Sequence, residues 1–185
     1  MPELMSRADA LAFMESHVSN RNLRKHMLAA EAVMRALARR LNQPEQLWAL
    51  AGLLHDLDYD ATCKDASRHA LLTAELLEQK GLPAEVIHAV KAHADKAPLD
   101  SSFDRAMYAC DPLTGFLVSC ALIRPEKKLD PVDLQFVKNR LAEKSFSRNV
   151  DREQIKTCEQ LGLPLDEFIQ IALDAMKAIA GELGL

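Results

Sequence analysis

The segment LAGLLHDLDYD (residues 50–60) ends a run of small and apolar residues with the pair His55 and Asp56. Residues 45–57 form a predicted helix that is apolar on nearly all sides, which is typical of a helix in the middle of a bundle. Burying an imidazole beside a carboxylate costs free energy unless a partner satisfies both groups. The segment therefore predicts a central helix whose end holds a bound group.

Helical periodicity extends from this segment in both directions and predicts an all-α protein. Apolar residues recur at intervals of three and four, as on one face of a helix. Only six glycines occur and β-branched residues are few, which disfavours a sheet. We expect a polar loop at residues 59–66, a short first helix around residues 11–18, and further helices over residues 23–41, 45–57, 67–80, 83–94, 103–123, 132–144 and 164–183.

The composition indicates one globular domain without a polyanionic partner. The chain has 185 residues, 49% hydrophobic and 27% charged, and a formal net charge of −4. This charge gives no basic field for nucleic acid or a membrane surface. Residues 1–10 lack an apolar signal-peptide core, no long apolar stretch occurs, and the four cysteines form no C-x-x-C pair. We therefore expect a cytoplasmic protein with reduced thiols, no membrane contact and no nucleic-acid partner.

Four of the six histidines recur with aspartates in separate predicted helices. In chain order the set is His26, His55, Asp56, His69, His93 and Asp111. Neutral imidazole nitrogens and carboxylate oxygens are ligands that Mn, Fe, Co, Ni and Zn accept. Adjacent helical residues diverge by about 100°, but a helix end relaxes this restriction, so one cation could bind both His55 and Asp56. The pattern predicts a site for a divalent transition metal.

Ordinary structural roles compete with metal binding for each histidine. A histidine in an apolar helix is commonly a hydrogen-bonded core or surface residue, and we expect this of His17 and His88. His88 and His93 are about 140° apart around a helix, so they cannot both face one site. His69 and His93 could also bind a substrate phosphate as imidazolium ions. The spacing alone leaves these alternatives open.

Several segments within residues 20–155 carry a family resemblance. They include NLRKHMLAAEAVMRALARR, LWALAGLLHDLDYD and MYACDPLTGFLVSCALIRPEKKL. Through them the chain resembles the HD superfamily of metal-dependent phosphohydrolases, and most closely the HDIG-type predicted hydrolases. Asp58 stands at the position of the HDIG glycine. The resemblance implies an all-α HD-domain bundle with the metal site between central helices. It implies a single domain over residues 1–185, with a core at about 20–125 and a C-terminal helical extension at about 130–185.

The resemblance also implies a set of metal ligands. In the superfamily the H…HD…D set binds one metal, and this set corresponds to His26, His55, Asp56 and Asp111. Members with two additional histidines often hold a second ion, and the aspartate of the HD pair is then shared. Those histidines correspond in order to His69 and His93. One or two divalent ions (Fe, Mn, Co, Ni or Zn) are thus the expected cofactors.

The expected reaction is hydrolysis of a phosphomonoester or phosphodiester, with a nucleotide as one candidate substrate. A divalent metal lowers the pKa of bound water and polarises a phosphoryl oxygen, so metal-activated hydroxide is the expected nucleophile. The expected catalytic residues are Asp56 and Asp58. Asp58 is either a general acid or, as we expect, the partner that orients His55. The expected substrate-binding cations are Lys127, Lys144 and Arg148.

Two other functions remain open from the sequence. The six-ligand arrangement also resembles di-iron HD-domain oxygenases, which use O₂ to cleave a C–C or C–P bond. A non-catalytic nucleotide-binding or sensor module would use the same pocket without turnover. The expected partner of the hydrolase is a small-molecule phosphate ester, and the sequence leaves a homodimer open.

Overall fold

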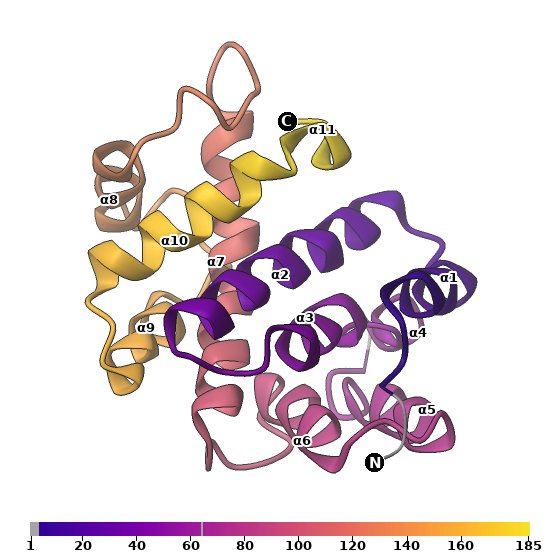
Figure 1. The fold of residues 1–185 in the computed structure, drawn as a ribbon. Helices are drawn as coiled ribbons and strands as arrows, with labels where there is room; N and C mark the ends of the chain where they lie inside the picture. Colours follow the sequence, from indigo (N-terminus) through magenta and orange to yellow (C-terminus); the bar gives the residue numbers. More distant parts are fainter. Residues whose placement is uncertain (1–3, 64) are drawn as a thin grey trace.

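The computed structural model describes residues 4–63 and 65–185 and contains no strand among them (Figure 1). This confirms the predicted all-α class. Residues 1–3 of the expected domain and residue 64 of the expected loop lie outside the described residues. In chain order the helices are α1 (Arg7–His17), α2 (Arg21–Arg40), α3 (Glu45–Leu54), α4 (Tyr59–Thr62), α5 (Leu71–Gln79), α6 (Ala84–His93), α7 (Ser102–Leu122), α8 (Leu134–Ala142), α9 (Arg152–Lys156), the 3₁₀ helix η1 (Thr157–Leu161), α10 (Leu165–Ala178) and α11 (Ala180–Leu183).

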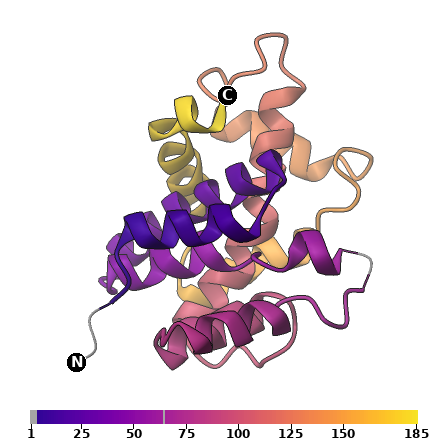
Figure 2. The ribbon, with the colours of Figure 1, turned by 90° about the vertical axis from the view of Figure 1, so that its right-hand side faces the viewer.

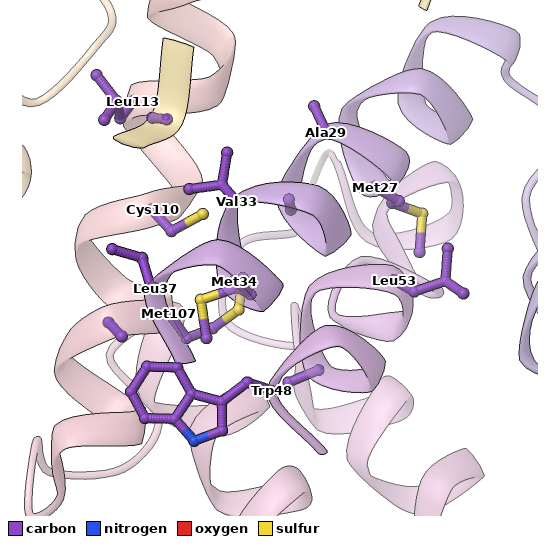
Figure 3. Packing of buried hydrophobic residues seen from close by; sticks show 14 of the residues in the cluster. Met27, Ala29, Val33, Met34, Leu37, Trp48, Leu53, Met107, Cys110 and Leu113 are labelled. Carbon is purple, nitrogen blue, oxygen red and sulfur yellow. The ribbon is translucent and has the colours of Figure 1, made fainter. Parts of the chain in front are cut away.

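Helix α3 is the central helix that the sequence predicted. Every residue from position 47 to position 54 is buried. Figure 3 shows Trp48 of α3 in one apolar cluster with Met34 of α2 and Met107 of α7. Burying a side chain of this size stabilises the fold by about 1.5–3 kcal/mol or more. This packing fixes the end of α3, where His55 lies.

Helices α2 and α3 approach each other closely at Gly52. A Cβ atom added to Gly52 would lie 2.5 Å from the carbonyl oxygen of Ala30 in α2. That distance is well inside van der Waals contact, so only glycine fits at this crossing. Ala30 lies about one turn after His26, and Gly52 lies about one turn before His55. The close crossing therefore brings these two imidazoles together.

Helix α7 carries Asp111 into the same region. Its start is fixed by a capping box, in which Ser101 Oγ accepts from the Asp104 N–H while the Asp104 carboxylate accepts from the Ser101 N–H. The helix continues through Pro112 to Leu122. Because α7 packs against α2, α3 and α6, Asp111 near its middle faces the helices that carry the histidines.

The segment between α3 and α5 differs from the prediction. The polar loop expected at residues 59–66 contains the short helix α4. The helix expected from Ser67 begins only at Leu71, because Ala70 adopts the left-handed conformation (φ 65°), which a right-handed helix cannot include. His69 consequently lies in a turn, and its direction is set by local contacts instead of by a helix axis.

The C-terminal part of the chain packs on the rest of the bundle. Helix α10 lies against α2 and α8, whereas α9 and η1 lie against α7. The single helix expected over residues 164–183 is interrupted at Ile179, whose N–H donates to the Met176 carbonyl in a tighter turn, so α10 and α11 are separate. None of the described helices has the length and apolar character needed to cross a membrane.

Candidate metal centre

Six side chains from separate parts of the chain converge beside the end of α3. They come from α2, the turn after α3, the turn before α5, the end of α6 and the middle of α7, and they are His26, His55, Asp56, His69, His93 and Asp111. Their nitrogen and oxygen atoms form two overlapping groups, each within 4.8 Å: His26, His55 and Asp56, and Asp56, His69 and His93. The sixth residue, Asp111, contacts the first group. The structure thus brings together every residue that the sequence singled out as a metal ligand.

One half of the cluster joins α2, α3 and α7. The Nε2 atoms of His26 and His55 are 3.2 Å apart. Asp111 Oδ1 lies 2.9 Å and 3.5 Å from these two nitrogens, and Asp56 Oδ2 lies 3.7 Å and 3.4 Å from them. Two ligand atoms at about 2.1 Å from a tetrahedral metal are about 3.4 Å apart. Each imidazole nitrogen therefore lies at the spacing of neighbouring metal ligands from the other imidazole and from both carboxylates.

The other half of the cluster uses the second oxygen of Asp56. Asp56 Oδ1 lies 3.4 Å from His69 Nε2 and 3.5 Å from His93 Nε2. The His93 ring is nearly perpendicular to the rings of His55 and His69, with centroids 4.9 Å and 5.1 Å away. Asp56 thus presents one carboxylate oxygen to each half, which is the arrangement of a carboxylate that two cations can share.

Main-chain carbonyls hold the other nitrogen of two imidazoles. The Nδ1–H of His55 donates to the Gly52 carbonyl at 2.9 Å, and the Nδ1–H of His93 donates to the Val90 carbonyl. A carbonyl oxygen can only accept, so Nδ1 carries a proton in both residues. Nε2 therefore faces the cluster and, once it carries no proton, directs its lone pair there, as in metal-binding histidines.

Side chains hold the other two imidazoles in the same way. His69 Nδ1 donates to the Asp58 carboxylate at 3.0 Å. His26 Nδ1 is 3.1 Å from Thr114 Oγ1, and the Thr114 hydroxyl donates its own proton to the Asp111 carbonyl at 2.9 Å. The hydroxyl oxygen therefore accepts from His26. All four imidazoles consequently use Nδ1 outside the cluster and direct Nε2 into it.

The cluster therefore gathers four imidazole Nε2 atoms and two carboxylates, which are the groups that bind a metal. The His93 Nε2 atom is buried and has no hydrogen-bond partner in the part of the chain that the structure describes. An unpaired buried polar atom costs about 1–3 kcal/mol. A divalent cation would satisfy these nitrogens and the carboxylates together, and mixed nitrogen and oxygen ligands suit Mn, Fe, Co, Ni or Zn. The residues present fit a divalent transition metal.

The electrostatics of the cluster also favour a cation. Burial lowers the pKa of His55, but the charges of Asp56 and Asp111 outweigh burial and raise this pKa well above its ordinary value. Burial raises the pKa of Asp56 and of Asp111, but the neighbouring histidines hold the pKa of each carboxyl below its ordinary value. Both carboxylates are therefore ionised at neutral pH, and their field attracts positive charge.

The cluster is closed at the back and open on one side. The side chains of His55 and His93 are buried, whereas those of Asp111, His26 and His69 are 29%, 21% and 18% exposed. These three residues therefore line the opening, and a substrate would reach the cluster from their side.

Tyr59 stands at this opening. It is 44% exposed, and its ring meets the ring of His69 edge to face with centroids 5.4 Å apart. Burial, and next the charge of Asp56, raise the pKa of Tyr59. The tyrosine therefore offers a neutral hydroxyl and an exposed ring face beside the cluster.

Asp58 has neither of the roles expected for it. It contacts His69 instead of His55, because the turn before α5 returns His69 toward it. Its side chain is 2% exposed, so it cannot reach a substrate. Burial raises the pKa of Asp58, but hydrogen bonds from His69 and Thr73 outweigh burial and lower it. An ionised carboxylate cannot donate a proton, so Asp58 is not placed as a general acid.

The three expected substrate cations are differently placed. Lys127 lies in the loop beyond the C-terminal end of α7, and Asp111 is roughly 16 Å from that end along the helix axis. Figure 1 shows this loop at the end of the molecule opposite α6. The structure therefore does not bring Lys127 to the cluster. Lys144 and Arg148 are exposed in the segment between α8 and α9. Figure 2 shows this segment and α4 on the same side of the molecule.

The fold and the cluster define a class: an all-α protein with a cluster of histidines and aspartates that could hold a metal between its central helices. The family comparison agrees with this class, because residues 23–130 match the HD domain model. The chain belongs to the HD domain family. The match includes all six residues of the cluster.

The curated relatives are longer proteins. Ribonuclease Y of Oleidesulfovibrio alaskensis is 27% identical over 114 residues, which cover 62% of this chain and 22% of that protein. Ribonuclease Y of Frankia casuarinae is 28% identical over 114 residues, and Ribonuclease Y of Acidothermus cellulolyticus is 30% identical over 114 residues, covering 17% and 23% of those proteins. The chain thus spans about a fifth of these relatives. No solved structure matches it.

Sequence reasoning missed three residues that shape the site. Thr114 orients His26, Gly52 sets the crossing of α2 and α3, and Tyr59 lines the opening. Weak signals existed for two of them: Gly52 is an isolated glycine in an apolar helix, and Tyr59 follows the HDLD segment directly. The role of Thr114 depends on the packing of α2 against α7, which no local pattern encodes.

Proposed function

We propose that the protein hydrolyses phosphate esters with two divalent metal ions held by the six-residue cluster. The observation that carries this proposal is the position of Asp56, whose two carboxylate oxygens face separate pairs of histidines. Divalent ions at these positions would supply an activated water and neutralise phosphate charge. Asp111 completes the ligand set on the side of His26 and His55.

The chain's own residues would prepare the site for this reaction. Hydrogen bonds from all four Nδ1 atoms keep the Nε2 atoms aimed at the cluster before any ion arrives. The buried His55 and His93 exclude water from the back of the site. The substrate would therefore approach only from the open side, past Tyr59 and Asp111.

A phosphodiester of nucleotide type is the substrate class that we propose. The relatives are named as ribonucleases, and enzymes of that kind cleave phosphodiesters. The exposed ring of Tyr59 at the opening offers a surface on which a base could stack. Lys144 and Arg148 remain the proposed substrate cations, because their segment lies on the same side of the molecule as α4 (Figure 2). Lys127 is not included, because it lies beyond the far end of α7.

Activity with defined metals tests the proposal. The protein would be purified anaerobically, stripped of metal, and reloaded with Mn²⁺ or Co²⁺. We expect hydrolysis of bis(p-nitrophenyl) phosphate under nitrogen, its loss on chelation, and its recovery when metal is returned. A slower rate on p-nitrophenyl phosphate would agree with diester specificity.

Two results of the same experiment would contradict the proposal. Turnover that requires iron and consumes O₂ would indicate an oxygenase. Tight nucleotide binding without hydrolysis of either ester with any metal would indicate a non-catalytic module.

A further inference from the structure

We propose that Asp58 is a positioning residue that sets the affinity of the cluster for its second ion, by fixing the tautomer and direction of His69. The inference rests on the proposed function, because it assumes that His69, His93 and Asp56 bind an ion. On this proposal a carboxylate outside the cluster controls the metal affinity of only one half of the cluster, the half that contains His69.

The buried Asp58 carboxylate is fixed from two sides. Its Oδ1 accepts from His69 Nδ1 at 3.0 Å, and its Oδ2 accepts from the Thr73 N–H at 3.0 Å. The Asp58 N–H donates to Thr73 Oγ1 at 3.1 Å in return. Thr62 Oγ1 lies 3.4 Å from the same carboxylate. Contacts at the start of α5 and from α4 therefore hold Asp58 in place.

His69 depends on this carboxylate more than the neighbouring histidines depend on their partners. His55 and His93 each donate from Nδ1 to a carbonyl three residues earlier, so their own helices orient them. His69 lies in a turn ended by the left-handed residue Ala70, and a side chain fixes its Nδ1. A carboxylate partner also makes the imidazole a more basic ligand.

The variant Asp58→Asn tests the tautomer directly. An amide has one oxygen where the carboxylate has two, but both His69 Nδ1–H and the Thr73 N–H require an acceptor. If the amide oxygen faces Thr73, the NH₂ group faces His69 and forces the ring proton onto Nε2. That nitrogen then has no lone pair for a metal. The effect is confined to the half of the cluster that contains His69.

The first measurement is a Mn²⁺ titration of the metal-free protein, monitored by calorimetry and electron paramagnetic resonance. We expect two classes of Mn²⁺ site in the wild type. In Asp58→Asn we expect the second class to bind 10–100-fold more weakly, the range for partners of metal-binding histidines, with the first class unchanged. If the second class of site in Asp58→Asn bound Mn²⁺ as tightly as it does in the wild type, the proposal would be overturned.

Two matched controls distinguish a specific effect on the orientation of His69 from a general loss of structure around Asp58. Asp60→Asn changes an exposed carboxylate in α4 that accepts from Ser19 and Asn20. Thr73→Val removes the hydroxyl that accepts from the Asp58 N–H but keeps the carboxylate and its bond to His69. Both variants should bind Mn²⁺ at the second class of site as the wild type does. If Thr73→Val lost this site as fully as Asp58→Asn, the role of Asp58 would be merely structural and the proposal would be wrong.

A metal-free readout keeps the inference testable if Asp58→Asn does not fold. In ¹⁵N spectra of the metal-free wild type, recorded at a pH at which the His69 ring is neutral, the single ring proton should lie on Nδ1, and a single proton on Nε2 would overturn the proposal. This result does not depend on hydrolysis. Failure of the proposed function would appear differently, as a wild type that binds no ion or hydrolyses no ester while His69 keeps the expected tautomer.

Discussion

Replacing Asp56 by asparagine is expected to abolish retention of both metal ions and to lower kcat/KM for a phosphodiester by at least about 10³-fold. The two oxygens of this carboxylate face the two halves of the cluster. Metal ions stabilise the charge of such transition states by several kcal/mol, and each 1.36 kcal/mol corresponds to about a tenfold change in rate. Elemental analysis and steady-state kinetics on the same preparation measure the two effects.

The control for this variant is Asp60→Asn, which removes a carboxylate four residues away in the same segment. The exposed Asp60 side chain accepts hydrogen bonds from Ser19 and Asn20, so metal content and turnover should match the wild type. Both variants should keep the helical circular-dichroism spectrum. Full metal content and activity in Asp56→Asn would reject the assignment of the site.

Replacing Gly52 by alanine is expected to lower the free energy of unfolding by about 2–3 kcal/mol. The new Cβ would lie 2.5 Å from the Ala30 carbonyl oxygen and 2.7 Å from the Glu31 nitrogen, and main-chain atoms cannot move aside cheaply. Overpacking of this kind typically costs about 1–3 kcal/mol. Because α2 must shift away from α3, His26 and His55 should also separate. Urea denaturation and a Mn²⁺ titration measure both consequences.

Gly115→Ala is the matched control for this effect. Gly115 also lies inside a helix, α7, but a Cβ there meets nothing within 4 Å. Alanine is a better helix former than glycine by about 0.5–1 kcal/mol, so this variant should be as stable as the wild type or more so. A Gly52→Ala protein with unchanged stability and metal affinity would show that the helix crossing does not position the site.

The sequence predicted the features of this fold that depend on periodicity. The buried run of α3 and the long amphipathic α2 were predicted with nearly correct bounds, because an apolar pattern directly reports which face is buried. The prediction placed the start of α5 too early, because Ala70 adopts the left-handed conformation directly before Leu71. No propensity distinguishes that alanine from those in a helix.

The identity of the cluster residues was predictable, but their partners were not. The sequence identified His26 and Asp111 as residues of one site, although their distance of 2.9 Å depends on the crossing of α2 and α7. The sequence interpretation pairs Asp58 with His55, but the structure pairs it with His69. In the structure an acceptor within its own helix already satisfies His55, so Asp58 is available to His69.

An anomalous-scattering map of crystals of the anaerobically purified, Mn²⁺-loaded protein would locate the metal ions themselves. We expect two peaks per chain, one among His26, His55 and Asp111, the other between His69 and His93, with the Asp56 carboxylate adjoining both. A cluster without anomalous density, with Asp111 turned away and protein groups or water filling the space, would contradict this expectation.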